Sequence, residues 1–269
     1  MGKPPDAGGY VNDPTQLTRA QRPPHSSRSA WREAALPRNE RVSDLRRASV
    51  LAQLSDSALQ NLAEKCKWRE HGTGEQILGR EDFSTDVYFL LAGTARAISY
   101  SSEGKAVVFT DLKPGAMFGE IAAIDQRPRS ASVEALEACE IASLSADEFE
   151  NLMLREPSVA VAALRKVTAD VRRLSQRVFE FSTLAVQNRI HAELLRLGGR
   201  PDQRHREVIL SPAPSLADIA DRISTHREAV SRELSRLTTM GLIRREKGHL
   251  VIGDVAKLRE MVNEAKGEL

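Results

Sequence analysis

Residues 118–132 hold a glycine, a carboxylate and a guanidinium that could together bind a phosphate and a sugar. The segment reads FGEIAAIDQRPRSAS. Gly119 permits close backbone approach, and the amides that follow it can face an anion. Glu120 can accept a hydrogen bond from a sugar hydroxyl, Arg129 can clamp a phosphate with its planar fork, and Ser130 can add a hydroxyl donor. A phosphate and a ribose held together describe a nucleotide.

A second group of polar residues, between 215 and 234, could read the bases of DNA. Two capping-box patterns, Ser215…Asp218 and Thr225…Glu228, predict two helix starts ten residues apart. The outward face of the second helix would present four polar side chains, those of Arg227, Glu228, Ser231 and Arg232. Arginine can read guanine O6 and N7, and a carboxylate can accept from cytosine N4. The pattern therefore predicts a helix-turn-helix, in which Glu228 has a competing role as a cap partner.

The elements that position the first group are short strands. Between 73 and 145, apolar or alternating runs such as VYFLLAG, ARAISY, AVVFTDL and EIASLS are separated by turn residues every 8–12 positions. This rhythm predicts a small antiparallel β-barrel or sandwich, with a hairpin loop at 101–104. A helix is expected before it, with Ser55 as its N-cap.

A long helix is expected after Pro157. Its apolar positions step by 3 and 4 residues through three heptads: Leu164, Val167, Val171, Leu174, Val178, Phe181 and Ala185. This a/d spacing favours a parallel dimer seam. The alternative is a helix packed on its own β-domain, which needs a wider apolar stripe.

The two predicted DNA-binding helices span about 216–223 and 226–240, and Gly241 closes the second. The following run, LIRREKGHLVI, predicts two short strands around residues 246–248, which would form a β-wing.

Composition places few limits on this picture. The 269 residues carry 39 Lys and Arg against 37 Asp and Glu, with 41% hydrophobic content, as in ordinary soluble proteins. By segment the net charge is +3 over residues 1–42, −4 over 43–185 and +3 over 186–269, so a polyanion would dock at the C-terminal third. Charges interrupt every apolar run, residues 1–30 lack a signal-peptide core, and the two cysteines cannot form a disulfide framework. We expect a cytoplasmic protein without a membrane segment.

The first group closely resembles the phosphate-binding cassette of cyclic-nucleotide-binding domains, through F-G-E-I-A…P-R-S-A-S. The resemblance implies that Glu120 binds the ribose 2′-hydroxyl and that Arg129 pairs with the cyclic phosphate. Backbone contacts would come from near Gly119, Ile121 and Ala122. In related domains a serine at the place of Ser130 is associated with tolerance of cGMP, so cGMP is a second expected ligand beside cAMP.

The second group resembles the DNA-binding domain of the CRP/FNR regulators, through R-E-x-V-S-R, and fits the branch of the cyclic-AMP receptor protein. The resemblance implies that Arg227, Glu228 and Arg232 read a TGTGA-like half-site. The expected DNA-binding residues are Thr225, His226, Arg227, Glu228, Ser231 and Arg232.

The chain departs from the family in three places. Glu81-Asp82 stands where the family often has Gly-Asp or Gly-Glu, and Ser224 stands where a glycine is common in the helix-turn-helix turn. A Thr-Ser pair that contacts the adenine base in that branch is replaced by Leu174 and Ser175. Because Leu174 cannot hydrogen-bond a base, the choice between cAMP and cGMP stays open, and Ser175 is left as the polar candidate.

The resemblance covers about residues 44–260 and implies an α+β fold. We expect a disordered extension over 1–42, a cyclic-nucleotide-binding β-roll over 43–156, a dimerisation helix over 157–185 and a winged helix-turn-helix domain over 186–269. The protein would be a homodimeric transcription regulator, with cAMP or cGMP as its allosteric ligand, a palindromic operator in double-stranded DNA and RNA polymerase as a further partner.

Three alternatives have little support in the residues. A haem or iron–sulfur sensor lacks ligand spacing, because the six histidines are scattered and only two cysteines exist. A channel or kinase regulatory subunit does not fit R-E-x-V-S-R, and an enzyme would need a motif that the chain lacks, so no metal and no catalytic activity are expected. A regulator of the same fold that is constitutive or answers another effector remains the alternative function.

Overall fold

The computed structural model describes residues 32–33, 38–199 and 207–267. The predicted extension over 1–42 lies largely outside the described residues. Regular structure nevertheless begins before residue 43, because helix α1 spans Arg38–Arg47. Val42 and Leu45 of this helix pack into the core of the following β-domain, which explains why the helix belongs to that domain.

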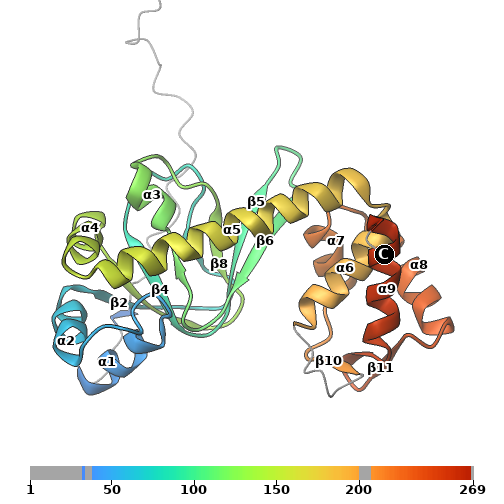
Figure 1. Cartoon of the computed structure of the whole chain (residues 1–269), viewed down its shortest axis with the longest axis horizontal. Coiled ribbons are helices and arrows are strands. Elements are labelled where there is room, and N and C mark those ends of the chain that lie inside the picture. Colours follow the sequence, from blue (N-terminus) through green and yellow to red (C-terminus); the bar gives the residue numbers. More distant parts are fainter. Residues whose placement is uncertain (1–31, 34–37, 200–206, 268–269) are drawn as a thin grey trace, which may run out of the picture. The chain divides into compact units, whose positions relative to one another are not determined.

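The described residues between Arg32 and Leu144 include a roll of two antiparallel sheets, as predicted from the spacing of strands and turns (Figure 1). The five-stranded sheet has the order β1-β2-β9-β4-β7, with bounds Arg32–Glu33, Lys67–His71, Cys139–Leu144, Val87–Ala92 and Met117–Phe118. The four-stranded sheet has the order β3-β8-β5-β6, with bounds Gln76–Leu78, Ser132–Ala135, Ala95–Tyr100 and Ala106–Leu112.

Strand β4 shows why its sequence is apolar without interruption. Val87, Phe89 and Leu91 belong to one buried cluster, together with residues of the helices. Tyr88 and Leu90 belong to the other cluster, together with residues of the four-stranded sheet. Alternate side chains of a strand face opposite sides, so a strand covered on both faces must be apolar at every position.

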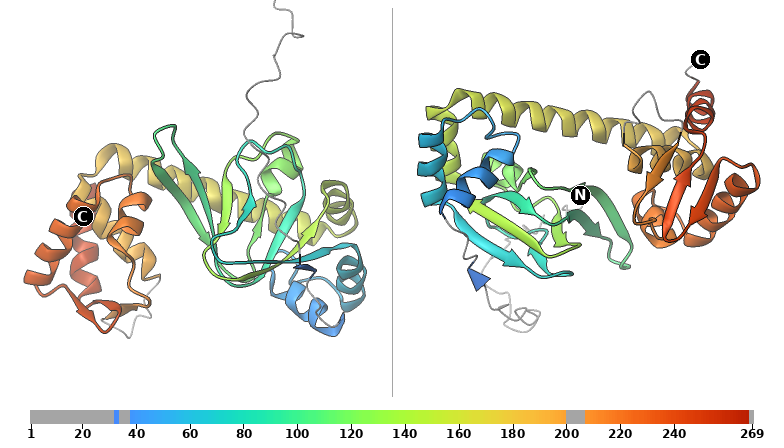
Figure 2. Two further views of the ribbon diagram at one scale, coloured as in Figure 1. Left: turned by 180° about the vertical axis from the view of Figure 1, so that it is seen from behind. Right: turned by 90° about the horizontal axis from the view of Figure 1, so that it is seen from below.

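Four further helices accompany the roll: α2 over Asp56–Lys65, α3 over Glu120–Asp125, α4 over Ala146–Arg155 and α5 over Pro157–Thr183. The Ser55 hydroxyl accepts from the Ala58 amide, which confirms the predicted N-cap of α2. Figure 2 shows α5 as one unbroken helix, and Pro157 occupies its first turn, where the missing N–H costs nothing.

The apolar seam of α5 is exposed along much of its length. Val159 and Ala163 are buried, but Leu164, Val171 and Val178 are 67%, 58% and 65% exposed. Leu174 and Phe181 are also exposed, and Val167 is half-buried. One predicted member lies elsewhere, because α5 ends at Thr183 and Ala185 is the N-cap of the next helix. The described residues of the chain therefore leave most of the stripe uncovered, whereas the alternative of packing on its own β-domain would require it to be covered.

The C-terminal part holds helices α6 (Val186–Leu197), α7 (Leu216–Arg222), α8 (Arg227–Thr239) and α9 (Val255–Lys266). A three-stranded sheet has the order β10-β12-β11, with bounds Val208–Leu210, His249–Ile252 and Ile243–Glu246. The two predicted helices and the wing are thus present, and β10 and α9 are additional elements. Residues from all of these elements form one buried cluster.

The two capping boxes have different outcomes. The Ser215 hydroxyl accepts from the Asp218 amide, so this cap is confirmed. The prediction for Thr225 is wrong, because the N-cap of α8 is His226 and it makes no side-chain cap. Ser224 is left-handed at φ 52°, and the Thr225 amide donates to the Ala220 carbonyl, so Thr225 belongs to the preceding turn.

Candidate ligand cavity and nucleic-acid interface

A cavity of about 310 Å³ lies between the cassette, the strands of the smaller sheet and helix α5. It brings together seven of the eight residues predicted to contact a cyclic nucleotide: Gly119, Glu120, Ile121, Ala122, Arg129, Ser130 and Leu174. The eighth, Ser175, is exposed on α5 and does not line the cavity. The remaining walls include the apolar residues Leu78, Leu112, Phe118 and Val133.

Gly119 is required by its surroundings. Its φ of 81° is left-handed, and a Cβ atom would lie 2.8 Å from Arg129 Nη1 and 2.9 Å from the Asp86 carbonyl oxygen. A methyl group there would displace either a backbone carbonyl or the guanidinium. The glycine thus lets the chain pass directly beside Arg129, and α3 starts at the next residue, Glu120.

The Arg129 side chain is buried at 3% exposure and is fixed by three acceptors. Its Nη1 donates to the Gly119 carbonyl at 2.7 Å, its Nη2 donates to the Asp86 carbonyl at 2.8 Å, and its Nε donates to Ser84 Oγ at 3.1 Å. Burial lowers the pKa of the guanidinium from its ordinary value. A guanidinium has five N–H groups, so one remains on each terminal nitrogen.

The loop opposite the cassette is held by backbone bonds. The Glu81 amide donates to the Arg129 carbonyl at 3.0 Å, and the Arg129 amide donates to the Asp82 carbonyl at 2.9 Å. Glu81 adopts a left-handed φ of 67° at the place where the family often has glycine. The departure at Glu81-Asp82 therefore keeps a turn that suits glycine, and Glu81 adopts its left-handed conformation at a cost in backbone strain.

Sequence reasoning missed three charged residues that line the cavity from α5: Lys166, Asp170 and Arg173. Lys166 Nζ forms an ion pair with the buried Glu120 carboxylate and lies 3.0 Å from Asp170 Oδ2. Arg173 lies 3.1 Å from Asp170 Oδ1. The signal was present as their spacing of four and three residues, which places side chains on one helix face.

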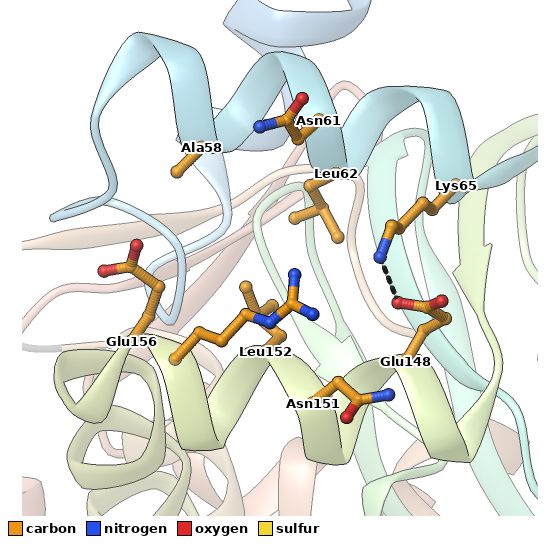
Figure 3. A pocket seen from close by; sticks show the side chains of 9 residues that line it. Ala58, Asn61, Leu62, Lys65, Glu148, Asn151, Leu152 and Glu156 are labelled. Atoms are coloured by element: carbon orange, nitrogen blue, oxygen red, sulfur yellow. Dashed lines mark hydrogen bonds and ion pairs between the residues drawn. The ribbon is translucent and has the colours of Figure 1, made fainter.

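A second, smaller cavity of about 110 Å³ lies between α2 and α4 (Figure 3). Lys65 of α2 forms an ion pair with Glu148 of α4 at its rim. It contains none of the predicted ligand residues. In the part of the chain that the structure describes, no group of three or more His, Cys, Asp or Glu side chains could hold a metal ion. Nor does that part contain a helix with the length and hydropathy needed to span a bilayer.

Helix α8 presents its predicted contact residues to solvent. Arg227, Glu228, Ser231 and Arg232 are all exposed, as is His226, and Thr225 is half-buried. Val230, Leu234 and Leu237 on the opposite face are buried in the C-terminal core. This division gives a helix whose outer face is polar and open, which is what insertion into a DNA groove requires.

A buried polar cluster joins α8 to α6 on the face of α8 that is turned away from solvent. The sequence analysis did not predict it. His191 of α6 is fully buried, and its Nε2 lies 2.5 Å from Glu233 Oε1. Arg236 donates to the same carboxylate at 2.7 Å. Burial lowers the pKa of the His191 imidazole, and hydrogen bonds from Arg236 and His191 hold the pKa of Glu233 low despite its own burial. The cluster fixes the base of α8 to α6.

The chain matches two protein families. Residues 68–156 match the cyclic nucleotide-binding domain, and residues 188–261 match the Crp-like helix-turn-helix domain. These ranges contain the cassette and the α7–α8 pair described above.

Three relatives extend the comparison to more than two thirds of this chain. The "cAMP-activated global transcriptional regulator CRP" of Salmonella typhimurium is 24% identical over 190 residues, which is 70% of this chain and 90% of that protein. The structure of the c-di-GMP responsive global regulator CLP of Xanthomonas campestris superposes with a TM-score of 0.64 at 17% identity, covering 74% of this chain and 99% of that one. A CRP/FNR family transcriptional regulator of Thermus thermophilus superposes with a TM-score of 0.59 at 23% identity, covering 73% and 98%.

All three relatives are regulators by name, and the two solved structures share the fold described here. The two family matches fall on the cassette and on the recognition helix, in the same order along the chain. The protein is therefore a member of the CRP/FNR family of transcription regulators.

Proposed function

We propose that this chain is a cyclic-nucleotide-responsive, sequence-specific DNA-binding regulator that acts as a homodimer on a palindromic operator, with cAMP or cGMP as its ligand. The observation that carries the proposal is the cavity in which the cassette meets α5. A ligand bound there touches the same helix that carries the exposed apolar stripe. Binding can therefore favour one arrangement of two copies over another.

The cassette supplies the phosphate and ribose contacts. Each terminal nitrogen of Arg129 has one N–H group outside these three bonds that can donate to a phosphate oxygen, and the guanidinium is already oriented by its three protein acceptors. Glu120 faces the cavity from the first turn of α3 and can accept from the ribose 2′-hydroxyl. Ser130 lines the cavity as a further donor.

The long helix supplies the dimer contact. Leu164, Val171 and Val178 are large, apolar and exposed on one face of α5, which is the composition of a coiled-coil seam. Ser175 lies outside the cavity of its own chain. In a parallel pair it would be placed to reach a nucleotide bound by the other copy.

The dimer would place two copies of α8 about one DNA turn, roughly 34 Å, apart on a two-fold symmetric operator. Arg227 and Arg232 would read guanine edges, Glu228 would accept from cytosine, and Thr225, His226 and Ser231 would add contacts to the same half-site. RNA polymerase is the further partner expected of such a regulator.

One observation favours a second candidate, a regulator of the same fold that is constitutive or answers another effector. The Glu120 carboxylate, which would accept the ribose hydroxyl, is ion-paired with Lys166. The neighbouring α5 position Leu174 offers no hydrogen bond to a base. A different ligand could make better use of these groups.

The test is calorimetric titration of nucleotide-stripped protein with cAMP and then cGMP, followed by DNA binding with and without the nucleotide. We expect micromolar binding of one ligand per chain and tighter operator binding in its presence. Arg129→Ala should abolish detectable nucleotide binding, because the phosphate loses its only buried cation among the described cavity residues. Arg127→Ala is the matched control, since Arg127 is exposed two positions earlier in the same cassette.

Two outcomes would contradict the proposal. Unchanged affinity in Arg129→Ala would remove the phosphate role. No heat with either nucleotide, checked at a second temperature, would favour the constitutive or differently triggered regulator.

A further inference from the structure

The hairpin of β5 and β6 is a single layer of sheet with the cavity on one face and helix α7 on the other. Ala97, Thr110 and Leu112 of this hairpin line the cavity. Arg96 and Asp111 are opposite each other across the two strands, and each is next to a cavity residue in the sequence. Because successive side chains of a strand point to opposite faces, those of Arg96 and Asp111 reach the outer face of the hairpin.

Four charged side chains form a closed ring on this outer face. Asp111 Oδ1 lies 2.7 Å from Arg96 Nε, and Asp111 Oδ2 forms an ion pair with Arg222 of α7. Asp218 of α7 closes the ring, because its Oδ1 lies 2.5 Å from Arg96 Nη1 and its Oδ2 lies 3.1 Å from Arg222 Nε. The charges alternate around the ring, so each has two partners of opposite sign.

The ion-pair ring is largely shielded from water. The side chain of Arg222 is 8% exposed and that of Arg96 is 15% exposed. Burial alone would raise the pKa of the Asp111 carboxyl, but the hydrogen bond from Arg96 and the charge of Arg222 hold that pKa below its ordinary value. An exposed pair contributes little, whereas removing one member of a shielded ring leaves a desolvated charge without its partner. The ring therefore holds α7 against the roll.

Helix α7 carries this contact to the recognition helix, and β6 carries it to the cavity. Ile219 and Ile223 of α7 lie in the same buried cluster as Val230 of α8, so the two helices pack as one unit. Phe109 of β6 lines the cavity, and its carbonyl accepts from Arg173 Nη1 of α5 at 2.7 Å. The same strand thus contacts the cavity directly and α8 through α7.

We propose that Asp111 is a positioning residue, whose ion pairs hold the helix-turn-helix to the roll and connect the cavity to α8 through β6, in addition to the connection along α5. This inference rests on the proposed function for the ligand in the cavity. A ligand that contacts Thr110 and Leu112 changes the position of β6, and Asp111, which lies between them in the sequence, passes the change to Arg222. Asp111 does not line the cavity, so it acts without touching the ligand.

The experiment compares the native chain with Asp111→Asn in three measurements. Calorimetry with cAMP and cGMP should show affinities that change by less than about twofold, because Asp111 lies outside the cavity. Fluorescence anisotropy with a palindromic duplex of TGTGA-like half-sites, with and without the nucleotide, gives the factor by which the nucleotide changes DNA affinity. We expect this coupling factor to fall by about fivefold or more, within the range that allosteric coupling spans.

Hydrogen exchange, measured without nucleotide or DNA, is the third measurement and does not depend on the ligand. Opening the ring removes ion pairs that join α7 to β6, so the amides of both elements should exchange faster in Asp111→Asn than in the native chain.

Arg96→Gln is the second variant, because it opens the same ring by removing a charge of the opposite sign. Both variants should lower the coupling factor, although Asp111→Asn makes the chain more positive and Arg96→Gln makes it less so. A general effect of charge on DNA binding would instead move the two variants in opposite directions. Glu103→Gln is the matched control, since it removes a negative charge at an exposed position in the loop of the same hairpin, and it should leave all three measurements unchanged.

The inference is overturned if either ring variant keeps the native coupling factor, or if α7 exchanges no faster once the ring is opened. A loss of nucleotide affinity of about tenfold in Asp111→Asn would also overturn it, because Asp111 would then belong to the ligand site. Binding of neither nucleotide by the native chain would overturn the proposed function, and the coupling role of Asp111 with it. The exchange measurement would then still decide whether the ring holds α7 to the roll.

Discussion

The ligand cavity and the recognition helix use arginines in opposite ways. In the cavity, Arg129 is buried and donates to three protein acceptors, and Arg173 is paired with Asp170. On α8, Arg227 and Arg232 are exposed, and among the described residues neither has a hydrogen bond or ion pair from its side chain.

The difference matches what each surface has to bind. A small ligand is selected by a few desolvated groups that are held in position before it arrives. A polyanion is met by exposed cations, and much of the binding free energy comes from released counterions. Mutations in the cavity should therefore act through fit, and mutations on the DNA-binding surface should act through charge and salt.

The largest effect is expected from Gly119→Ala. The new Cβ would crowd Arg129 and the Asp86 carbonyl while the backbone stays left-handed, so we expect roughly 2–3 kcal/mol less stability and loss of nucleotide binding. Chemical denaturation and calorimetry measure the two effects. Gly104→Ala is the matched control, because Gly104 has a similar φ of 77° with nothing within 4 Å of the added Cβ. Equal losses in the two variants would mean that the contact with Arg129 is unimportant.

On the DNA-binding surface, Arg232→Ala should cost about 1–3 kcal/mol on the cognate operator and little on random DNA, because a base contact is lost. Fluorescence anisotropy with both DNAs measures this. An equal loss on random DNA would show instead that Arg232 contacts a phosphate.

The wing sharpens the same comparison. Arg244 is tied to Glu207 and Glu246, whereas Arg245 is exposed without an ion pair among the described residues. Arg245→Ala should weaken binding to all sequences and reduce the salt slope by about one, and Arg244→Ala should do much less. A larger loss from Arg244→Ala would contradict the role of the free charge.

Acid should destabilise the support of α8. Burial lowers the folded-state pKa of His191, and a second proton would leave Nδ1 a buried donor without a partner among the described residues. The unfolded chain then binds that proton first, so the stability that this histidine contributes is present above pH about 6.5 and is lost as pH falls through that value towards the folded pKa.

The free energy of unfolding, measured by chemical denaturation at several pH values between about 5 and 8, tests this. His191→Gln should flatten the decline, and His249→Gln, at an exposed wing position, should leave it unchanged. A decline of the same slope in His191→Gln would assign the acid sensitivity to other groups.

The smallest effect is expected from Ser224→Gly. Ser224 is left-handed at φ 52°, a conformation that glycine adopts without a Cβ penalty, so the change should stabilise the C-terminal domain by about 0.5–1 kcal/mol. Thermal unfolding measures the gain, and operator affinity should not change. A loss of stability would mean that the hydroxyl has a role in the turn.

Short sequence motifs and the spacing of apolar and turn residues were enough to predict the cassette, the α7–α8 pair and several strands. The serine caps at 55 and 215 accept from backbone amides three residues away, so their neighbours in the sequence are also their neighbours in space. Prediction failed where local patterns competed. Thr225 suited an N-cap by its residue type, but its amide donates to the Ala220 carbonyl, which places it in the turn, and His226 stands at the N-cap position.

The sequence by itself determined which functional groups this protein carries and their local order: Glu120 and Arg129 in one glycine-containing turn, and exposed arginines along one helix. Only the tertiary structure decided which side chains share the cavity. Lys166 meets Glu120 across 46 residues of sequence, and His191 meets Glu233 across 42. No local periodicity encodes such pairs, because they depend on how α5 packs on the roll and how α6 packs under α8. The charged side chains that α5 contributes to the cavity reach it only once that helix is in place.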